Sequence, residues 1–252
     1  MFPPFLYAFL PVMTVSLNSS AADRRGLLIA IIVLLAAMAV SIVFIDRPLA
    51  AVLMNVDPRL HAIAERVTWF GHSTSYLVTF SVAAIALALI SWRAPSEELR
   101  GLARGWAWLC LYLFLAVALS GIANDIVKAF VGRARPQIEP QELRPFFFGY
   151  DYQSFPSGHA ATAFGLAFGL SALLPRLRWL FVILAAVVAS SRVILNVHHL
   201  GDVIASVVVA LLVVRWLTAF FASRHLLFER DPSGRPQFRL PRRANSRRIT
   251  PA

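Results

Sequence analysis

Polar residues that could bind and transfer a phosphate group interrupt an otherwise apolar chain between positions 128 and 202. They form three groups: Lys128 with Arg135 and Pro136, then Pro156 to His159, then Ser191 and Arg192 with His198 and Asp202. Lys128 is the only lysine among 24 basic residues, so a compact ammonium is exceptional in this chain and suits a phosphate oxyanion. Ionisable groups inside or at the rim of membrane helices are costly, and they are usually functional or paired.

His198 and Asp202 are spaced to act as a pair. They lie four positions apart, so they share a helix face if the last predicted helix begins near Val197. The carboxylate can then accept a hydrogen bond from Nδ1 of the imidazole, which leaves the Nε2 lone pair as nucleophile or base. His159 supplies a second imidazole. Transfer through a covalent intermediate needs one nitrogen to attack phosphorus and another group to protonate the leaving oxygen.

Phosphoryl transfer also requires positive charge around the phosphate oxygens, and the candidates are Lys128, Arg135 and Arg192. A helix that starts at Pro156 would add free backbone N–H groups and the helix dipole. A metal site is the competing interpretation wherever His and Asp cluster. No Cys cluster, His-x3-His pair or carboxylate set completes a ligand shell, so the sequence predicts neither a metal nor another cofactor.

The elements that must position these residues are membrane-spanning helices. With 58% hydrophobic residues, 15% charged residues and a mean hydropathy of +0.68, the 252-residue chain departs far from a soluble protein. Its apolar runs are long, which favours helices over barrel strands. We expect an all-α fold, a six-helix transmembrane bundle with spans at about 27–45, 75–92, 105–131, 157–174, 179–197 and 200–221.

The charged positions predict how the bundle is oriented. Segment 46–74 mixes charged and apolar residues, which indicates an interfacial helix between the first two spans. Arginines concentrate near 93–104, at 176–178 and in the tail, so these regions are expected to be cytoplasmic, with both termini. The loops that carry the candidate residues then lie outside. The formal charge of +11 follows from this topology and does not indicate a nucleic-acid partner.

Three regions are expected along the chain. Residues 1–26 predict a weakly ordered lead-in, and residues 27–221 form the six-helix domain. Residues 222–252 are rich in Arg, Pro and Ser, which predicts a disordered basic tail that can touch anionic lipid headgroups.

Together, the three polar groups resemble the signature of a known family. The pattern Lys128-x6-Arg135-Pro136, Pro156-Ser157-Gly158-His159 and Ser191-Arg192-x5-His198-x3-Asp202 is similar to that of the type 2 phosphatidic acid phosphatase (PAP2) superfamily. The resemblance implies that His198 becomes phosphohistidine, that Asp202 orients it and that His159 protonates the leaving group. The phosphate-binding residues that it implies are Lys128, Arg135, Ser157, Gly158 and Arg192.

The resemblance also implies a reaction. It is metal-independent hydrolysis of a phosphomonoester or pyrophosphate on a membrane lipid, at the outer side of the plasma membrane, the inner membrane in a bacterium. Expected substrates are phosphatidate, phosphatidylglycerophosphate, polyprenyl pyrophosphate or lipid A. Lipid-to-lipid phosphotransfer is an alternative, because a phosphohistidine accepts attack by water or by a hydroxyl. Further alternatives are a vanadate-dependent haloperoxidase, whose members are soluble, and a non-enzymatic lipid transporter.

Three of the four histidines outside the signature lie close to segments that carry the site or flank the spans. His199 follows the expected nucleophile and is expected at the interface. His61 and His72 have no visible partner and are expected to be surface or interfacial residues. The loop before Pro156 is too short for a cap domain, so substrate specificity is expected from a lateral opening and from segment 46–74.

Overall fold

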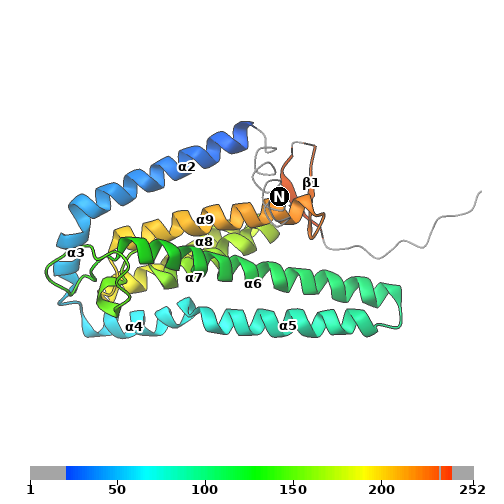
Figure 1. Ribbon diagram of the computed structural model, residues 1–252, viewed down its shortest axis with the longest axis horizontal. Helices are drawn as coiled ribbons and strands as arrows, with labels where there is room; N and C mark the ends of the chain where they lie inside the picture. The colour runs from blue at the N-terminus through cyan, green and yellow to red at the C-terminus, as the bar shows by residue number, and fades with distance from the viewer. Residues whose placement is uncertain (1–20, 233, 240–252) are drawn as a thin grey trace, which may run out of the picture.

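The computed structural model describes residues 21–232 and 234–239, and these residues are mostly helical (Figure 1). The α-helices are α2 (Ala21–Val40), α3 (Asp46–Leu53), α4 (Pro58–Thr68), α5 (Ser73–Arg93), α6 (Glu97–Val131), α7 (Gly158–Leu173), α8 (Arg178–Ile194) and α9 (Leu200–Ser223). Shorter helical turns are η2 (Ser41–Ile45), η3 (Trp69–Gly71), η4 (Tyr150–Tyr152) and η5 (Pro175–Leu177). Strands β1 (Phe228–Arg230) and β2 (Pro236–Phe238) form an antiparallel hairpin. The described part of the predicted lead-in, residues 21–26, begins α2.

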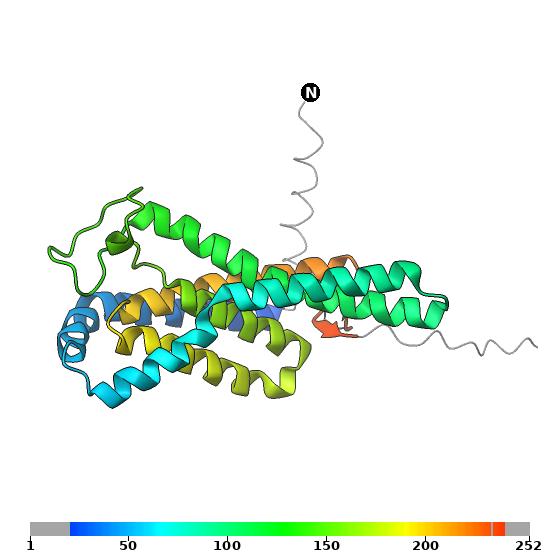
Figure 2. The ribbon, with the colours of Figure 1, turned by 90° about the horizontal axis from the view of Figure 1, so that it is seen from below.

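The long helices run lengthwise beside one another (Figure 2). α5 and α6 form an antiparallel hairpin, α7 packs against α6, α8 and α9, and α2 packs against α9. Because the helices alternate in direction, α3, α4, the connection after α6 and the α8–α9 turn gather at one end (Figure 1). We call it the α3–α4 end, and the opposite end, where α5 turns into α6, the α5–α6 end.

Five segments are long and apolar enough to cross a membrane: Arg24–Leu53, Pro58–Arg93, Glu97–Val131, Pro175–Ile194 and Leu200–Ser223. α7, which corresponds to the predicted span 157–174, has only 16 residues. It lies among α6, α8 and α9, and more than half of its residues are buried, so it presents little surface to lipid. The predicted all-α membrane fold is confirmed, with five long spans and this shorter buried helix.

Large apolar side chains cover the outside of the bundle. Val33 on α2, Ile85 on α5 and Ile183 on α8 are 59%, 62% and 59% exposed. Soluble proteins rarely expose apolar surface over so many elements. The surface therefore matches the hydrocarbon core of a bilayer.

Segment 46–74 differs from the single interfacial helix that the sequence predicts. It forms α3 and α4, with a break before Pro58. Asp57 caps α4 by accepting a 2.7 Å hydrogen bond from the Arg59 N–H, and Pro58 follows in the first turn, where no N–H donor is needed. α4 packs against α8, so it belongs to the bundle.

The described part of the predicted disordered tail is folded. Residues 222–223 complete α9, and the β1–β2 hairpin follows. Phe228 is 1% exposed, and its ring centroid lies 5.1 Å from that of Tyr112 in a cluster with Phe221. Burial of this aromatic side chain orders a segment whose overall composition is basic. Residues 240–252, where the rest of this prediction falls, lie outside the described residues.

Small residues let α6 and α7 approach closely. A Cβ atom at Gly165 would lie 2.8 Å from the Ala116 carbonyl oxygen and 2.9 Å from Ser120 Oγ. A Cβ atom at Gly169 would lie 3.2 Å from the Ala116 Cβ. Close backbone approach at small residues stabilises helix pairs in membranes, and here it holds α7 against α6.

We expect Gly165→Ala to destabilise the bundle, because the added methyl group meets the Ala116 backbone. Overpacking of this kind costs about 1–3 kcal/mol. Gly121→Ala is the matched control, since a Cβ atom there meets nothing within 4 Å and alanine favours a helix. Thermal unfolding in detergent compares the two variants. Equal melting temperatures would contradict the tight crossing.

Candidate active site

All eight residues predicted to form the site come from the α3–α4 end. They are Lys128 in the last turn of α6, Arg135 in the following connection, Ser157, Gly158 and His159 at the start of α7, Arg192 in the last turn of α8, His198 in the α8–α9 turn and Asp202 in the first turn of α9. Lys128, Arg192 and His198 are close enough to His159 to interact with it electrostatically. Arg135 interacts in the same way with Lys128 and with Asp202. The helix ends therefore bring the predicted residues together.

The start of α7 is built to receive an anion. Ser157 is the N-cap residue, and its Oγ and His159 Nε2 are buried atoms that have no hydrogen-bond partner among the described residues. A Cβ atom at Gly158 would lie 3.9 Å from Lys128 Nζ, so the ammonium lies beside the first helical residue. A helix N-terminus with a nearby cation and free polar atoms attracts a phosphate.

Two buried residues outside the signature hold this helix entry in place. Asn124 on α6 donates from Nδ2 to the Pro156 carbonyl at 3.2 Å. Ser206 on α9 is also buried, with its Oγ 2.8 Å from the Ser157 carbonyl oxygen and 3.2 Å from Asn124 Oδ1. The position of Ser157 is thus fixed by both neighbouring helices.

The α8–α9 turn fixes His198 relative to Arg192. The Arg192 carbonyl accepts hydrogen bonds from the N–H groups of Val197 and His198 at 3.2 and 3.3 Å. Asn196 has a positive φ of 54°, a conformation that asparagine tolerates better than most residues. Its Nδ2 donates to the Ala50 carbonyl at 3.2 Å, which ties the turn to α3.

The His198 imidazole is oriented by a backbone carbonyl. The side chain is buried, and Nδ1 lies 2.7 Å from the Ser154 carbonyl oxygen. A carbonyl oxygen can only accept, so this contact assigns the proton to Nδ1 and leaves the lone pair on Nε2. Asp202 Oδ2 lies farther from Nδ1, at 3.7 Å. The structure therefore differs from the predicted direct hydrogen bond to Asp202, whose charge acts over the longer distance.

Asp202 positions His198 through Ser154. Its fully buried carboxylate accepts hydrogen bonds from Ser154 Oγ at 2.5 Å, the His199 N–H at 2.8 Å and Arg133 Nη1 at 2.7 Å. The same serine thus contacts the carboxylate through its side chain and the nucleophile candidate through its carbonyl. Nothing in the sequence spacing indicated the role of Ser154, because a backbone carbonyl leaves no signature.

Arg133 joins Asp202 to a second buried carboxylate. Its Nη2 donates to Asp46 Oδ2 at 2.8 Å, and Asp46 Oδ1 also accepts from Ser41 Oγ at 2.7 Å and from the Gly201 N–H at 3.0 Å. Asp46 is only 1% exposed, although the sequence placed it in an interfacial segment. Sequence reasoning missed this network. The one signal for it was an extra arginine inside the Lys128-x6-Arg135 pattern.

The two site arginines are held by neutral acceptors, which leaves their charge for a ligand. Arg135 donates from Nε to the Tyr150 carbonyl at 2.9 Å and from Nη1 to the Val197 carbonyl at 2.7 Å. Arg192 donates from Nη1 to Thr68 Oγ1 at 2.8 Å. A guanidinium has five N–H donors, so these bonds do not exhaust either side chain.

Of the three histidines with predicted surface or interfacial positions, only His199 is buried, whereas His72 is exposed and the His61 side chain is 45% exposed. His199 is 3% exposed, and its backbone N–H binds Asp202. The His72 ring lies 4.7 Å from the His159 ring, nearly edge-on. His61 Nδ1 lies 3.7 Å from Glu65 Oε1. The predicted lack of partners is therefore wrong for both residues. Glu65 lies one turn after His61 on α4, whereas His72 meets His159 because η3 approaches α7, which the sequence pattern does not show.

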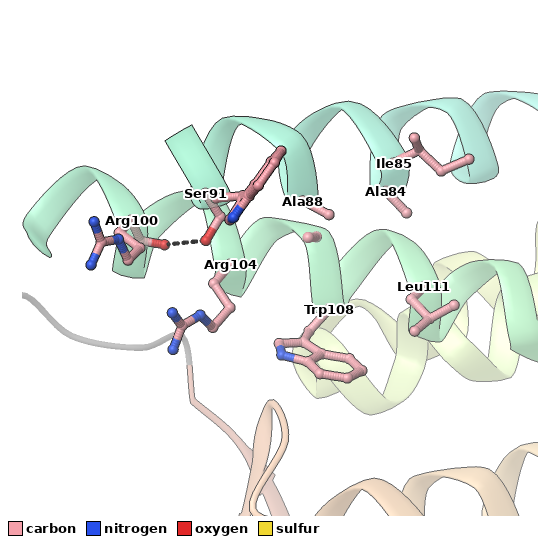
Figure 3. Close-up of a pocket in the computed structure, with 10 residues that line it drawn as sticks. Ala84, Ile85, Ala88, Ser91, Arg100, Arg104, Trp108 and Leu111 are labelled. Atoms are coloured by element: carbon pink, nitrogen blue, oxygen red, sulfur yellow. Dashed lines mark hydrogen bonds between the residues drawn. The ribbon is translucent and has the colours of Figure 1, made fainter. Parts of the chain in front are cut away.

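A cavity of about 820 Å³ lies between α5 and α6, away from the site (Figure 3). Its lining includes Ser91, Arg104 and Trp108, and none of the eight predicted residues. From Arg104 to Lys128, α6 rises about 36 Å. Size alone therefore does not locate the site, and the convergent polar groups at the α3–α4 end do.

We expect Arg133→Met to destabilise the protein, because it leaves two buried carboxylates without their counter-charge. Breaking a buried ion pair costs about 3–5 kcal/mol. Arg144→Met is the matched control, since Arg144 pairs with Glu142 at the surface, where the cost is about 1 kcal/mol or less. Thermal unfolding in detergent measures both variants. If Arg133→Met is no less stable than Arg144→Met, the network is not structurally important.

Comparison with known proteins agrees with the sequence signature. Residues 105–226 match the family model of the PAP2 superfamily. A lipid A 1-phosphatase of Rhizobium johnstonii is 32% identical over 215 residues, which cover 81% of this chain and 84% of that protein. A lipid A 1-phosphatase of Rhizobium etli is 31% identical over 211 residues, which cover 79% of this chain and 87% of that protein.

A solved structure shares the fold. The crystal structure of a transmembrane PAP2-type phosphatidylglycerolphosphate phosphatase from Bacillus subtilis superposes with a TM-score of 0.54 at 23% identity. The alignment covers 79% of this chain and 95% of that one. The family predicted from the three polar groups is thereby confirmed. The chain belongs to the PAP2 superfamily and is a membrane-embedded phosphatase.

Proposed function

We propose that the protein hydrolyses a lipid phosphate through a phosphohistidine at His198. The 2.7 Å contact between Nδ1 and the Ser154 carbonyl is the observation that carries this proposal, because it leaves the Nε2 lone pair free. Burial lowers the pKa of His198 below its usual range, although Asp202 opposes the shift. The imidazole is therefore neutral near pH 7 and can attack phosphorus.

The reaction has two steps. Nε2 of His198 attacks phosphorus, a P–N bond forms, and the P–O bond to the lipid breaks while His159 gives a proton to the departing oxygen. Water then attacks phosphorus, His159 takes up a proton from it, and the P–N bond breaks to release inorganic phosphate. Lys128, Arg135 and Arg192 stabilise the negative charge on the equatorial oxygens in both steps.

Lipid A 1-phosphate is the substrate that we propose. The two curated relatives that cover most of the chain are lipid A 1-phosphatases, at 32% and 31% identity. A site reached by several acyl chains also needs an apolar route from the bilayer, because the phosphate must meet His198 while the tails stay in lipid.

An apolar cavity of about 370 Å³ supplies such a route. It is lined by Val67 and Phe70 near the end of α4, by Ala163 on α7 and by Val188 on α8. Ala163 lies one turn after His159, and Val188 lies one turn before Arg192. The cavity is therefore about 6 Å from the phosphate site along both helices. An acyl chain in it would hold the headgroup at the helix ends.

We also propose that the α3–α4 end faces the outer side of the membrane, the periplasm of a bacterium. The arginines that flank the α5–α6 connection (Arg93, Arg100 and Arg104) and those at the α7–α8 connection (Arg176 and Arg178) lie at the other end, where the positive-inside rule predicts the cytoplasm. A lipid phosphate in the outer leaflet would then reach the site directly.

His198→Ala should lower phosphate release from lipid A by at least about 1,000-fold, because it removes the attacking nitrogen. The assay uses purified protein in detergent with lipid A, phosphatidate, phosphatidylglycerophosphate and polyprenyl pyrophosphate. His225→Ala, an exposed histidine after α9, is the control and should keep wild-type activity. Full activity in His198→Ala would refute the proposed nucleophile. Release only from the other lipids would refute the proposed substrate.

The acid limb of kcat/KM should lie below the ordinary histidine pKa of about 6.5, since burial lowers the pKa of His198. Protonation removes the Nε2 lone pair, so activity is lost only as the pH falls through this lowered value. Asp202→Asn should move the limb to still lower pH, because it removes a negative charge that favours protonation. A pH series of initial rates measures the limb. A limb above pH 6.5 would contradict a buried neutral nucleophile.

A further inference from the structure

A second, polar hollow adjoins the phosphate site. Its volume is about 450 Å³, within the range of about 300–1,000 Å³ that is usual for small-molecule sites. We call it the polar hollow; its lining residues are His61, Glu65, Thr68, Trp69, His72, Leu195 and Val197. None of them belongs to the PAP2 signature.

Direct contacts connect the polar hollow with the residues that bind phosphate. Thr68 accepts the 2.8 Å hydrogen bond from Arg192 Nη1. The His72 ring lies 4.7 Å from the His159 ring. Gly71 lies between Thr68 and His72 in the sequence. A Cβ atom at Gly71 would lie 2.7 Å from His159 Cδ2, so the backbone of η3 touches this histidine. A group bonded to a phosphate in the site would therefore extend into the hollow.

The end of α4 and the adjoining η3 separate polar from apolar surroundings. Val67 and Phe70 line the apolar cavity, whereas Thr68 and Trp69 line the polar hollow. Helical geometry explains this division, because residues next to each other in sequence point in different directions around the helix. One short segment thus offers a place for an acyl chain on one side and for a polar headgroup on the other.

The lining of the hollow suits a sugar ring. Trp69 is 71% exposed, and its ring centroid lies 5.2 Å from that of His72. A flat aromatic face binds the C–H groups of a pyranose, while nearby polar side chains can bind its hydroxyl groups. The pair of His61 and Glu65 supplies such donors and acceptors at the wall. A glycerol headgroup has no ring to stack on this face.

We propose that the polar hollow binds the sugar that carries the scissile phosphate, and that Trp69 is the residue on which this sugar stacks. The proposal rests on the proposed function, since it assigns the headgroup of the same substrate. It gives the α4–η3 segment the role of distinguishing a glycolipid phosphate from a glycerolipid phosphate.

A binding experiment tests this subsite without turnover. The full-length protein in detergent is titrated by calorimetry with two phosphonates, the C-glycosyl phosphonate of glucosamine and methylphosphonate. The wild type should bind the sugar phosphonate about tenfold more tightly, a ratio that corresponds to one stacked contact. Trp69→Ala should lose this preference but keep its affinity for methylphosphonate. Trp179→Ala, which changes a similarly exposed tryptophan on α8 (66% exposed), should keep the preference.

The possible results distinguish a failure of the sugar subsite from a failure of the proposed function. Equal affinities for the two phosphonates in the wild type, or an unchanged preference in Trp69→Ala, would overturn the sugar subsite alone. Loss of affinity for both phosphonates in Trp69→Ala would show a general structural effect and would also overturn it. Failure of the wild type to bind either compound would count against the phosphate site itself. The proposed function fails separately, if the wild type releases no phosphate from any lipid.

Discussion

The α3–α4 end depends on one buried arginine between two carboxylates. Arg133 donates to Asp202 and to Asp46, both of which are almost completely buried. Without this cation, two negative charges would face each other away from water, which is strongly unfavourable. With it, Asp202 can hold Ser154 on one side and the start of α9 on the other. The tautomer of His198 is thus set by a chain of contacts that begins at Arg133.

The same network links the first membrane helix to the proposed catalytic residues. Asp46 lies at the junction between α2 and α3, and its carboxylate binds the Gly201 N–H at the start of α9. Among the described helices, α2 packs mainly along α9, and most of its surface is not covered by the rest of the protein. A helix that makes few lateral contacts is therefore anchored by polar bonds at one end, where they also serve the site. This arrangement explains why a buried ion network lies so near the proposed nucleophile.

The sequence predicted which polar residues converge at the α3–α4 end, but not the bonds among them. Patterns of residue type identified the three polar groups, and the expected helix ends brought them together because each group adjoins an apolar run. The bond from His198 to the Ser154 carbonyl has no side-chain signature. The Arg133–Asp46 contact joins positions 87 apart, so only the folded packing reveals it. In the same way, η3 reaches His159 through a tertiary contact that no local periodicity indicates.

The fold also combines features that the sequence predicts with features that only the packing reveals. Hydropathy predicted the long spans, but α7 is short because it is enclosed by other helices, and β1 and β2 are ordered by burial of Phe228 against α6 and α9. Both features depend on neighbours far away in the sequence. Composition over a window reports the average environment of a segment, whereas these two segments depend on specific partners.

The proposed attack of His198 Nε2 on phosphorus leaves a covalent intermediate that can be trapped. The most direct measurement is a rapid alkaline quench of the protein during turnover of lipid A labelled in its 1-phosphate, followed by peptide mapping of the label. We predict that the label is found as phosphohistidine on the peptide that contains His198, and that it disappears in His198→Ala. Label on another residue, or turnover with no labelled protein at any quench time, would contradict the claim.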